Sequence, residues 1–213
     1  MVLGITGKYC AGKSAVSEVF AAWGWHIIDV DRLGHHALIE KRDEVLQRFG
    51  RELDDGAGGI DRKRLGAIVF RNRTALRYLE SIVHPSMVAM VDHELAEIGT
   101  VTEAVEADRA AAGTDRAAAG GEKPKVAINA ALLYPMGLAE RCDRVVWVYA
   151  GFLARFRRAR RRDGIGLLEM LRREHAQKRI RPQFYRVDVD IVTVTNNGDR
   201  TTLERRLHEI VDS

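Results

Sequence analysis

Short apolar runs rich in β-branched residues recur along the chain and predict five β-strands. The runs do not alternate strictly between apolar and polar residues, which is typical of strands covered on both faces. Segments with apolar residues at helical spacing separate them, so strands and helices alternate and predict a parallel sheet wrapped by helices. The predicted strands cover residues 2–6, 26–30, 125–129, 144–149 and 190–195.

The interval between the second and third predicted strands is far longer than one crossover helix needs. It contains several segments of helical period, so we expect a helical cap, at about residues 36–99, over the ligand edge of the sheet. Asp61 and Thr74 precede two of these segments and are predicted helix N-caps. His84 stands before Pro85, a position that disfavours helical geometry, and predicts a turn at the edge of the cap.

Residues 100–124 carry almost no large apolar side chains. They include eight alanines and end in Gly-Gly-Glu-Lys-Pro. This stretch cannot bury much surface and predicts a solvent-exposed helix followed by a flexible loop. We expect one domain over residues 1–213, with its core at residues 1–35, 125–150 and 187–213.

A phosphate-loop motif follows the first predicted strand. In GITGKYCAGKSAV, residues 4–16, the template positions are Gly7, Gly12, Lys13 and Ser14. In such a strand–loop–helix context, backbone N–H groups and the positive helix end hold the β-phosphate, Lys13 reaches the β and γ oxygens, and Ser14 ligates Mg²⁺. The predicted ATP-binding residues of the loop are Gly7, Lys8, Tyr9, Cys10, Ala11, Gly12, Lys13, Ser14 and Ala15.

Two carboxylates end the second predicted strand. Asp29 and Asp31 alternate around Val30, so in an extended chain both side chains would point the same way, into the ligand crevice. One could accept or orient a hydroxyl proton, and the other could hold a metal-bound water. The alternative is that Asp29 or Asp31 only caps the helix that follows.

Arginine dominates the basic residues. The formal net charge is +4, and only seven of the 34 lysines and arginines are lysine. Arginine binds phosphate oxygens in pairs, which suits a nucleotide, but nucleic-acid binding or a genome-wide bias toward arginine codons explains the same composition.

Residues 151–186 concentrate this charge, with eleven arginines against three acids. Two charged helices joined by a glycine-bracketed turn predict a lid that closes over phosphates. A nucleic-acid-binding arm and a plain solvated face are the alternatives. Only four aromatic residues lie among these arginines, which leaves few platforms for stacking bases.

The cysteine content favours a reducing compartment. Cys10 and Cys142 are too few and too isolated for a disulfide framework or a thiolate zinc site. No apolar run approaches the length of a membrane span, and the N-terminus lacks the pattern of a signal peptide. We therefore expect a cytoplasmic protein with no membrane partner, and the sequence does not indicate its oligomeric state.

Five motifs together resemble the dephospho-coenzyme A kinase family in order and spacing along nearly the whole chain. They are GKYCAGKS, DVDRLGH, VHP, LLYPMGL and RRARRRD. The resemblance implies a P-loop NTPase fold of the nucleoside-monophosphate-kinase type, with a helical substrate cap and an arginine-rich lid. It also implies transfer of the ATP γ-phosphoryl to the ribose 3′-hydroxyl of dephospho-CoA, with Mg²⁺ as cofactor and no nucleic-acid partner.

The resemblance further implies roles for individual residues. Asp31 looks like the family's catalytic carboxylate, Lys13 and Ser14 like its nucleotide and Mg²⁺ residues, and Arg158 and Arg162 like its lid arginines. Arg158 is expected to bind ATP. The predicted catalytic residues are Asp31, Lys13 and Arg162, and the predicted substrate-binding residues are Asp29, Asp31, His35 and His84.

Five positions depart from the family pattern. Lys8 and Cys10 stand where glycines are usual, which puts the geometry of the loop in question. Asn129 replaces an acid but can still accept a hydrogen bond from a metal-bound water. Pro135 replaces a glutamate, and Thr195 replaces an aspartate near the last strand. The alternative functions are another nucleoside or nucleotide kinase of this fold and a nucleotide-dependent RNA-binding protein.

Overall fold

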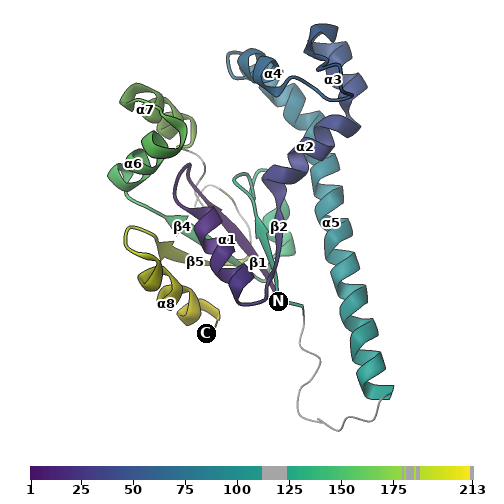
Figure 1. Cartoon of the computed structure of the whole chain (residues 1–213), viewed down its shortest axis with the longest axis vertical. Coiled ribbons are helices and arrows are strands. Elements are labelled where there is room, and N and C mark those ends of the chain that lie inside the picture. The colour runs from purple at the N-terminus through teal and green to yellow at the C-terminus, as the bar shows by residue number, and fades with distance from the viewer. Residues whose placement is uncertain (112–123, 179, 181–184, 186–187, 212–213) are drawn as a thin grey trace. The chain divides into compact units, whose positions relative to one another are not determined.

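Five strands form the sheet that the apolar runs predict (Figure 1). The computed structural model describes residues 1–111, 124–178, 180, 185 and 188–211. The strand order is β2-β3-β1-β4-β5, in which β1 pairs in parallel with β3 and β4, and β4 pairs in parallel with β5. The predicted α/β class is confirmed. The strands are β1 (Val2–Gly7), β2 (His26–Asp29), β3 (Val126–Asn129), β4 (Arg144–Tyr149) and β5 (Asp190–Thr195).

The first of two compact units, Met1–Ile28 with Glu97–Ser213, is built on this sheet. Its core joins helices from both ends of the chain, because Phe20 of α1 and Leu207 of α8 share one apolar cluster with Ile5 of β1. All three side chains are fully buried. The helices of this unit are α1 (Lys13–Ala22), the 3₁₀ helix η2 (Leu138–Arg141), α6 (Phe152–Asp163), α7 (Leu167–Ala176) and α8 (Arg200–Val211).

The predicted pair of charged helices within residues 151–186 is confirmed as α6 and α7. Gly164 follows α6 in the left-handed conformation, at φ 67°, and ends that helix. The backbone N–H of Gly164 donates to the carbonyl of Arg160 at 3.1 Å. Three arginines of the predicted lid lie outside the described residues: Arg179, Arg181 and Arg186.

The second unit, Asp29–Ala96, consists of helices, as the long interval between the second and third strands predicts. Val45 of α3, Leu53 of η1 and Leu65 of α4 lie in its apolar cluster. Among the described residues, no helix combines the length and apolarity needed to cross a bilayer. The elements are α2 (Val30–Glu40), α3 (Arg42–Phe49), η1 (Arg51–Leu53), α4 (Arg62–Val69) and the first part of α5 (Arg73–Ala111).

The C-terminal part of α5 covers the beginning of the alanine-rich stretch. The helix predicted there is present as far as Ala111. The remainder of the predicted flexible loop, residues 112–123, lies outside the described residues.

The turn predicted at His84–Pro85 is wrong, because α5 runs through both residues. A proline inside a helix removes one N–H and clashes with the carbonyl four residues earlier, at a cost of about 3 kcal/mol. That carbonyl belongs to Ser81, which is exposed like Pro85, so water can hydrate it. Burial of Val83 and Met87 on α5 offsets the cost.

The two predicted helix caps have different outcomes. The Asp61 carboxylate accepts hydrogen bonds from two N–H groups in the first turn of α4, as predicted. Thr74 does not cap α5. Instead, the side-chain oxygen of Asn72 accepts hydrogen bonds from the N–H groups of Thr74, at 2.9 Å, and Ala75, at 3.1 Å.

Replacing Asn72 by alanine is expected to lower the free energy of unfolding by about 1 kcal/mol, because two N–H groups of α5 lose their acceptor. Thr74→Ala is the matched control, since this exposed side chain is not the cap. Urea denaturation monitored by circular dichroism measures both. Equal losses in the two variants would contradict the assignment of the cap to Asn72.

Candidate active site

The predicted phosphate loop forms a tight turn between β1 and α1. Gly12 has φ 98°, a left-handed conformation that favours glycine, and a Cβ there would overlap the side-chain nitrogen of Asn196. Gly7 lies so close to β4 that a Cβ would overlap the carbonyl oxygen of Val148. The N–H of Ala11 donates to the carbonyl of Lys8 at 3.0 Å, which closes the turn. Both template glycines are therefore required by the backbone.

Cys10 adopts a left-handed backbone conformation, which glycine takes more easily than any other residue. Its φ of 57° makes it the one non-glycine residue with positive φ among the described residues. A side chain in this region costs roughly 1–2 kcal/mol. The loop therefore forms a closed turn with a non-glycine residue at position 10, and the backbone strain lies at Cys10.

Lys13 and Ser14 begin α1, directly after the turn. The Lys13 ammonium donates to the carbonyl of Gly7 at 3.4 Å, so the side chain folds back over the loop. Ser14 is exposed in the first turn, where the helix has N–H groups without intrahelical acceptors. A helix start of this kind binds phosphate through its N–H groups and its positive end.

A residue that sequence reasoning missed, Asn196, holds the loop in place. Its side-chain nitrogen donates to the carbonyl of Ala11 at 3.0 Å, and Asn196 is only 6% exposed. The Arg158 guanidinium donates to the same carbonyl at 3.0 Å and to the carbonyl of Asn196 at 2.7 Å. The position after the last strand, in the stretch VTN, was the available signal.

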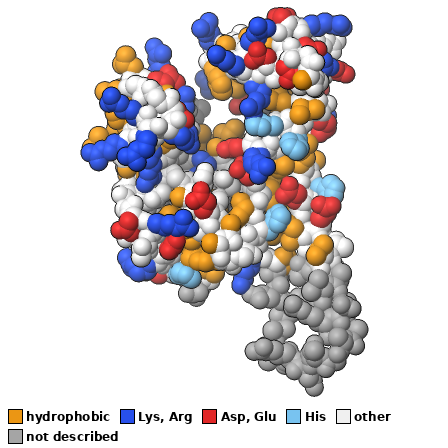
Figure 2. Space-filling model, in the orientation of Figure 1, with side chains coloured by type: hydrophobic (Ala, Val, Ile, Leu, Met, Phe, Trp, Pro, Cys, Tyr) orange, Lys and Arg blue, Asp and Glu red, His pale blue; other side chains and the backbone are white. Residues whose placement is uncertain are grey.

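An arginine-lined cavity of about 530 Å³ lies along one face of α6. Figure 2 shows basic side chains gathered over α6 and α7. Because Arg158 also binds the phosphate loop, this positive cavity adjoins the predicted phosphate site. Its lining consists of Ala154, Arg157, Arg158, Arg161, Arg162 and Asn197.

Lys8 and Tyr9 contact α6 and α7, the two helices of the predicted lid. The Lys8 ammonium forms an ion pair with Glu174 of α7. The backbone N–H of Tyr9 donates to the side-chain oxygen of Gln177 at 2.8 Å, just beyond α7. The Tyr9 hydroxyl donates to Asp163, which also pairs with Arg162.

In the second unit, the expected parallel orientation of Asp29 and Asp31 is wrong. The second strand ends at Asp29, one residue earlier than predicted, and Val30 already begins α2. The Asp29 carboxylate caps α2 by accepting from the N–H of Asp31, at 3.1 Å, and of Arg32. The chain is not extended at Val30 because Asp29 caps a helix that begins there, so the alternation expected for a strand does not apply to Asp31.

Asp31 and His35 share one exposed face of α2, since they are four residues apart on a helix. His84 is half-buried in α5 of the same unit. Burial lowers the pKa of His84, against an opposing effect of Glu80, so its imidazole is neutral near pH 7.

Comparison with known sequences assigns the chain to a protein family. The sequence model of the dephospho-CoA kinase family matches residues 1–107. A dephospho-CoA kinase of Geobacter sulfurreducens is 31% identical over 98% of this chain and 96% of its own length. The chain belongs to the dephospho-CoA kinase family.

Solved structures share the fold of this chain. A Thermus thermophilus protein superposes with a TM-score of 0.73 at 27% identity, covering 100% of this chain and 96% of its own. A dephospho-CoA kinase from Campylobacter jejuni superposes with a TM-score of 0.62 at 20% identity, covering 99% of this chain and 95% of its own, and supports the fold. The P-loop kinase fold predicted from the resemblance is therefore confirmed.

Asn129, where the resemblance predicts an acid, occupies the last position of β3. It is 6% exposed, and its side-chain oxygen has no hydrogen-bond partner in the part of the chain that the structure describes. Its register partner on β1 is Ile5, two residues before Gly7. An unsatisfied oxygen acceptor therefore lies beside the strand that enters the phosphate loop. Of the other two departures, Pro135 is exposed and Thr195 ends β5.

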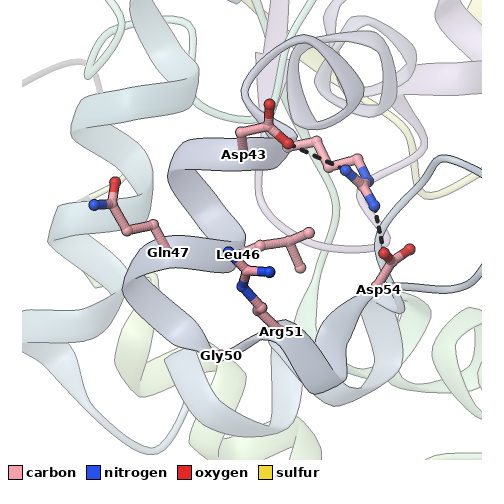
Figure 3. A pocket seen from close by; sticks show the side chains of 7 residues that line it. Asp43, Leu46, Gln47, Gly50, Arg51 and Asp54 are labelled. Atoms are coloured by element: carbon pink, nitrogen blue, oxygen red, sulfur yellow. Dashed lines mark hydrogen bonds and ion pairs between the residues drawn. The ribbon is translucent and has the colours of Figure 1, made fainter.

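The second unit contains a cavity that sequence reasoning missed, of about 680 Å³. The Arg42 guanidinium forms ion pairs with Asp43, at 3.1 Å, and with Asp54. Figure 3 shows the side chains that line the cavity, among them Asp43, Arg51 and Asp54. Two carboxylates face one guanidinium, so these three groups together carry a net negative charge. The lining residues are Arg42, Asp43, Leu46, Gln47, Gly50, Arg51 and Asp54.

Replacing Cys10 by glycine is expected to raise the free energy of unfolding by about 0.5–1 kcal/mol, because glycine relieves the left-handed strain but loses more chain entropy. Cys10→Ala is the matched control, since alanine removes the thiol and keeps the strained Cβ. Urea denaturation compares the three proteins. Equal stabilisation by both variants would show that the thiol, and not the backbone, is the source of the effect.

Proposed function

We propose that this protein transfers the γ-phosphoryl group of ATP to the ribose 3′-hydroxyl of dephospho-CoA, which gives CoA and ADP in the last step of coenzyme A biosynthesis. One observation carries the proposal: a complete phosphate-loop turn, with Gly7, Gly12, Lys13 and Ser14 in place, in a chain of this family. Two free cysteines fit a cytoplasmic location. Neither nucleic acid nor a membrane is expected as a partner.

On the nucleotide side, the chain supplies fixed hydrogen-bond donors. The loop from Gly7 to Ala15 would hold the β-phosphate through its N–H groups, and Lys13 would turn from the carbonyl of Gly7 to the β and γ oxygens. Arg158 keeps the loop in shape and lines the arginine cavity, so it can bind the nucleotide from the lid side.

The transferred group would meet Arg162, whose guanidinium is exposed and hydrogen-bonded to Asp163 at 3.0 Å. This hydrogen bond raises the pKa of Arg162, so it stays charged. A fixed guanidinium stabilises the charge that develops on the equatorial oxygens during phosphoryl transfer.

On the acceptor side, Asp31 would orient the 3′-hydroxyl and accept its proton. Its exposed position in the first turn of α2 leaves the carboxylate accessible. His35, one turn further on the same face, and the neutral His84 would contribute hydrogen bonds to the acceptor. Asp29 would hold the start of α2, and through it Asp31, in place.

The residues also fit the Mg²⁺ ion that such kinases use. Magnesium takes one or two oxygen ligands from the protein and others from phosphates and water. Ser14 would ligate the ion, and the buried, unsatisfied oxygen of Asn129 would accept a hydrogen bond from its water. When bound, Mg²⁺ would neutralise charge on the β- and γ-phosphates.

An acceptor panel tests the proposal. Purified protein with Mg²⁺ and ATP is mixed in turn with dephospho-CoA, UMP, CMP, shikimate or buffer, and ADP release is followed. We expect dephospho-CoA alone to raise ADP release well above buffer. Faster release with a nucleoside monophosphate would assign the chain to another kinase reaction, and no release with any acceptor would overturn a kinase function.

Asp31→Asn is expected to lower kcat by about 100-fold or more with little change in ATP affinity, because the carboxylate acts on the acceptor hydroxyl. Asp29→Asn removes the same charge two residues away while keeping a good N-cap, and should affect kcat much less. Steady-state kinetics and ATP titration measure both. Weakened ATP binding with unchanged kcat would show that Asp31 has another role.

A further inference from the structure

Two positions of the phosphate loop that the general template leaves free, Lys8 and Tyr9, bind the lid. Their partners come from both lid helices and from Gln177, just after α7. The contacting residues of the loop and of the lid are more than 150 residues apart in sequence but belong to the same compact unit. These contacts therefore connect the two parts of the chain that would surround the triphosphate.

Lys8 contacts α7 through a three-membered charge network. Glu174 binds the Lys8 ammonium with one carboxylate oxygen and the guanidinium of Arg155, at 2.7 Å, with the other. Arg155 is 5% exposed and donates through Nε to the carbonyl of Ala150 at 3.0 Å. Burial alone would raise the pKa of Glu174, but the hydrogen bond from Lys8 and the ion pair with Arg155 outweigh it and lower the pKa. Glu174 is thus charged at neutral pH and ties the loop to both helices.

Tyr9 organises two lid arginines. The guanidinium carbons of Arg173 and Arg162 lie 4.5 Å and 5.4 Å from the centroid of the Tyr9 ring, within the range of cation–π attraction. The Tyr9 hydroxyl donates to Asp163, and Asp163 binds Arg162 through Nε at 3.0 Å. Burial and the hydrogen bond with Asp163 raise the pKa of Tyr9 to about 12, so the hydroxyl keeps its proton.

We propose that Tyr9 and Lys8 are positioning residues for phosphoryl transfer. Tyr9 sets the guanidinium groups of Arg162 and Arg173 beside the phosphate loop, and Lys8 fastens α7 to the loop through Glu174. This inference rests on the proposed kinase function and deepens it. A glycine at position 8 has no side chain to reach α7, so the departure at Lys8 has a function of its own in this chain.

The physical gain is preorganisation. Arginine side chains have high rotamer freedom, and a guanidinium that is already oriented loses less entropy when charge develops on the phosphoryl group. Tyr9 restrains Arg162 through its ring and, by way of Asp163, through its hydroxyl. The ring contacts both arginines, whereas the hydroxyl reaches only Arg162, by way of Asp163.

The first experiment compares Tyr9→Ala, Tyr9→Phe and a control on the same lid, Leu168→Ala, whose side chain is 75% exposed on α7. Steady-state kinetics use whichever acceptor the panel identifies. We expect Tyr9→Ala to lower kcat by about 10-fold or more with KM for the acceptor within about 3-fold, since misplaced catalytic groups act on the transition state. Tyr9→Phe keeps the ring and should retain kcat within about 3-fold.

Hydrogen–deuterium exchange of the ligand-free proteins gives a readout that needs no acceptor. Peptides covering α6 and α7 should exchange faster in Tyr9→Ala than in the wild type, Tyr9→Phe or Leu168→Ala. If α6 and α7 of Tyr9→Ala exchanged at the wild-type rate, Tyr9 would not hold the lid against the phosphate loop. Faster exchange with unchanged kcat would overturn the positioning role, and neither result depends on dephospho-CoA being the acceptor.

A double-mutant cycle tests Lys8. Lys8→Gln and Glu174→Gln should each speed exchange in α7, Glu174→Gln more strongly because it also weakens the contact with Arg155. Adding Lys8→Gln to Glu174→Gln should change little further. Additive effects in the double variant would show that Lys8 does not act through Glu174.

Discussion

The turn from β1 into α1 is the constraint on which the site depends. Gly12 must take a left-handed conformation, and Asn196 fills the space that a side chain there would need. Asn196 and Arg158 both bind the carbonyl of Ala11, so a strand end and a lid helix hold one loop. Because β1 is paired on both sides within the sheet, the turn starts from a rigid support, and α1 presents its N-terminal N–H groups from a defined place.

In the predicted lid, residues 151–186, each acidic side chain forms an ion pair with an arginine. Asp163 binds Arg162, Glu169 binds Arg173 at 3.0 Å, and Glu174 binds Arg155. Each of the three acids in residues 151–186 thus orients one particular guanidinium, and two of those guanidinium groups contact Tyr9 of the phosphate loop. The surplus of arginine remains to attract phosphate, while the paired arginines keep a fixed geometry.

The parts of this protein that local rules determine could be predicted from its sequence. The five apolar runs, the loop template and the cap at Asp61 depend on neighbouring residues alone, and the structure contains all of them. The prediction at Pro85 was wrong because packing along α5 overrides a local preference. Asn196 was missed because its function depends on Ala11, which is distant in sequence. The contacts of Lys8 and Tyr9 could not be predicted for the same reason, because their partners are also distant in sequence.

Lys8 and Asn129, which both depart from the pattern that the resemblance predicts, each make the charge near the phosphate loop more positive, but only Lys8 has an ionic partner. Lys8 adds a positive charge that shares the Glu174 carboxylate with Arg155, and this ion pair connects the loop to α7. Asn129 removes a negative charge beside β1, and nothing in the described chain hydrogen-bonds its buried oxygen. The surroundings of the loop are therefore more positive than with an acid at position 129, which favours the triphosphate itself. If Mg²⁺ accompanies the nucleotide, as proposed, a neutral amide at position 129 would attract it less than a carboxylate would, and the phosphates would supply more of the attraction.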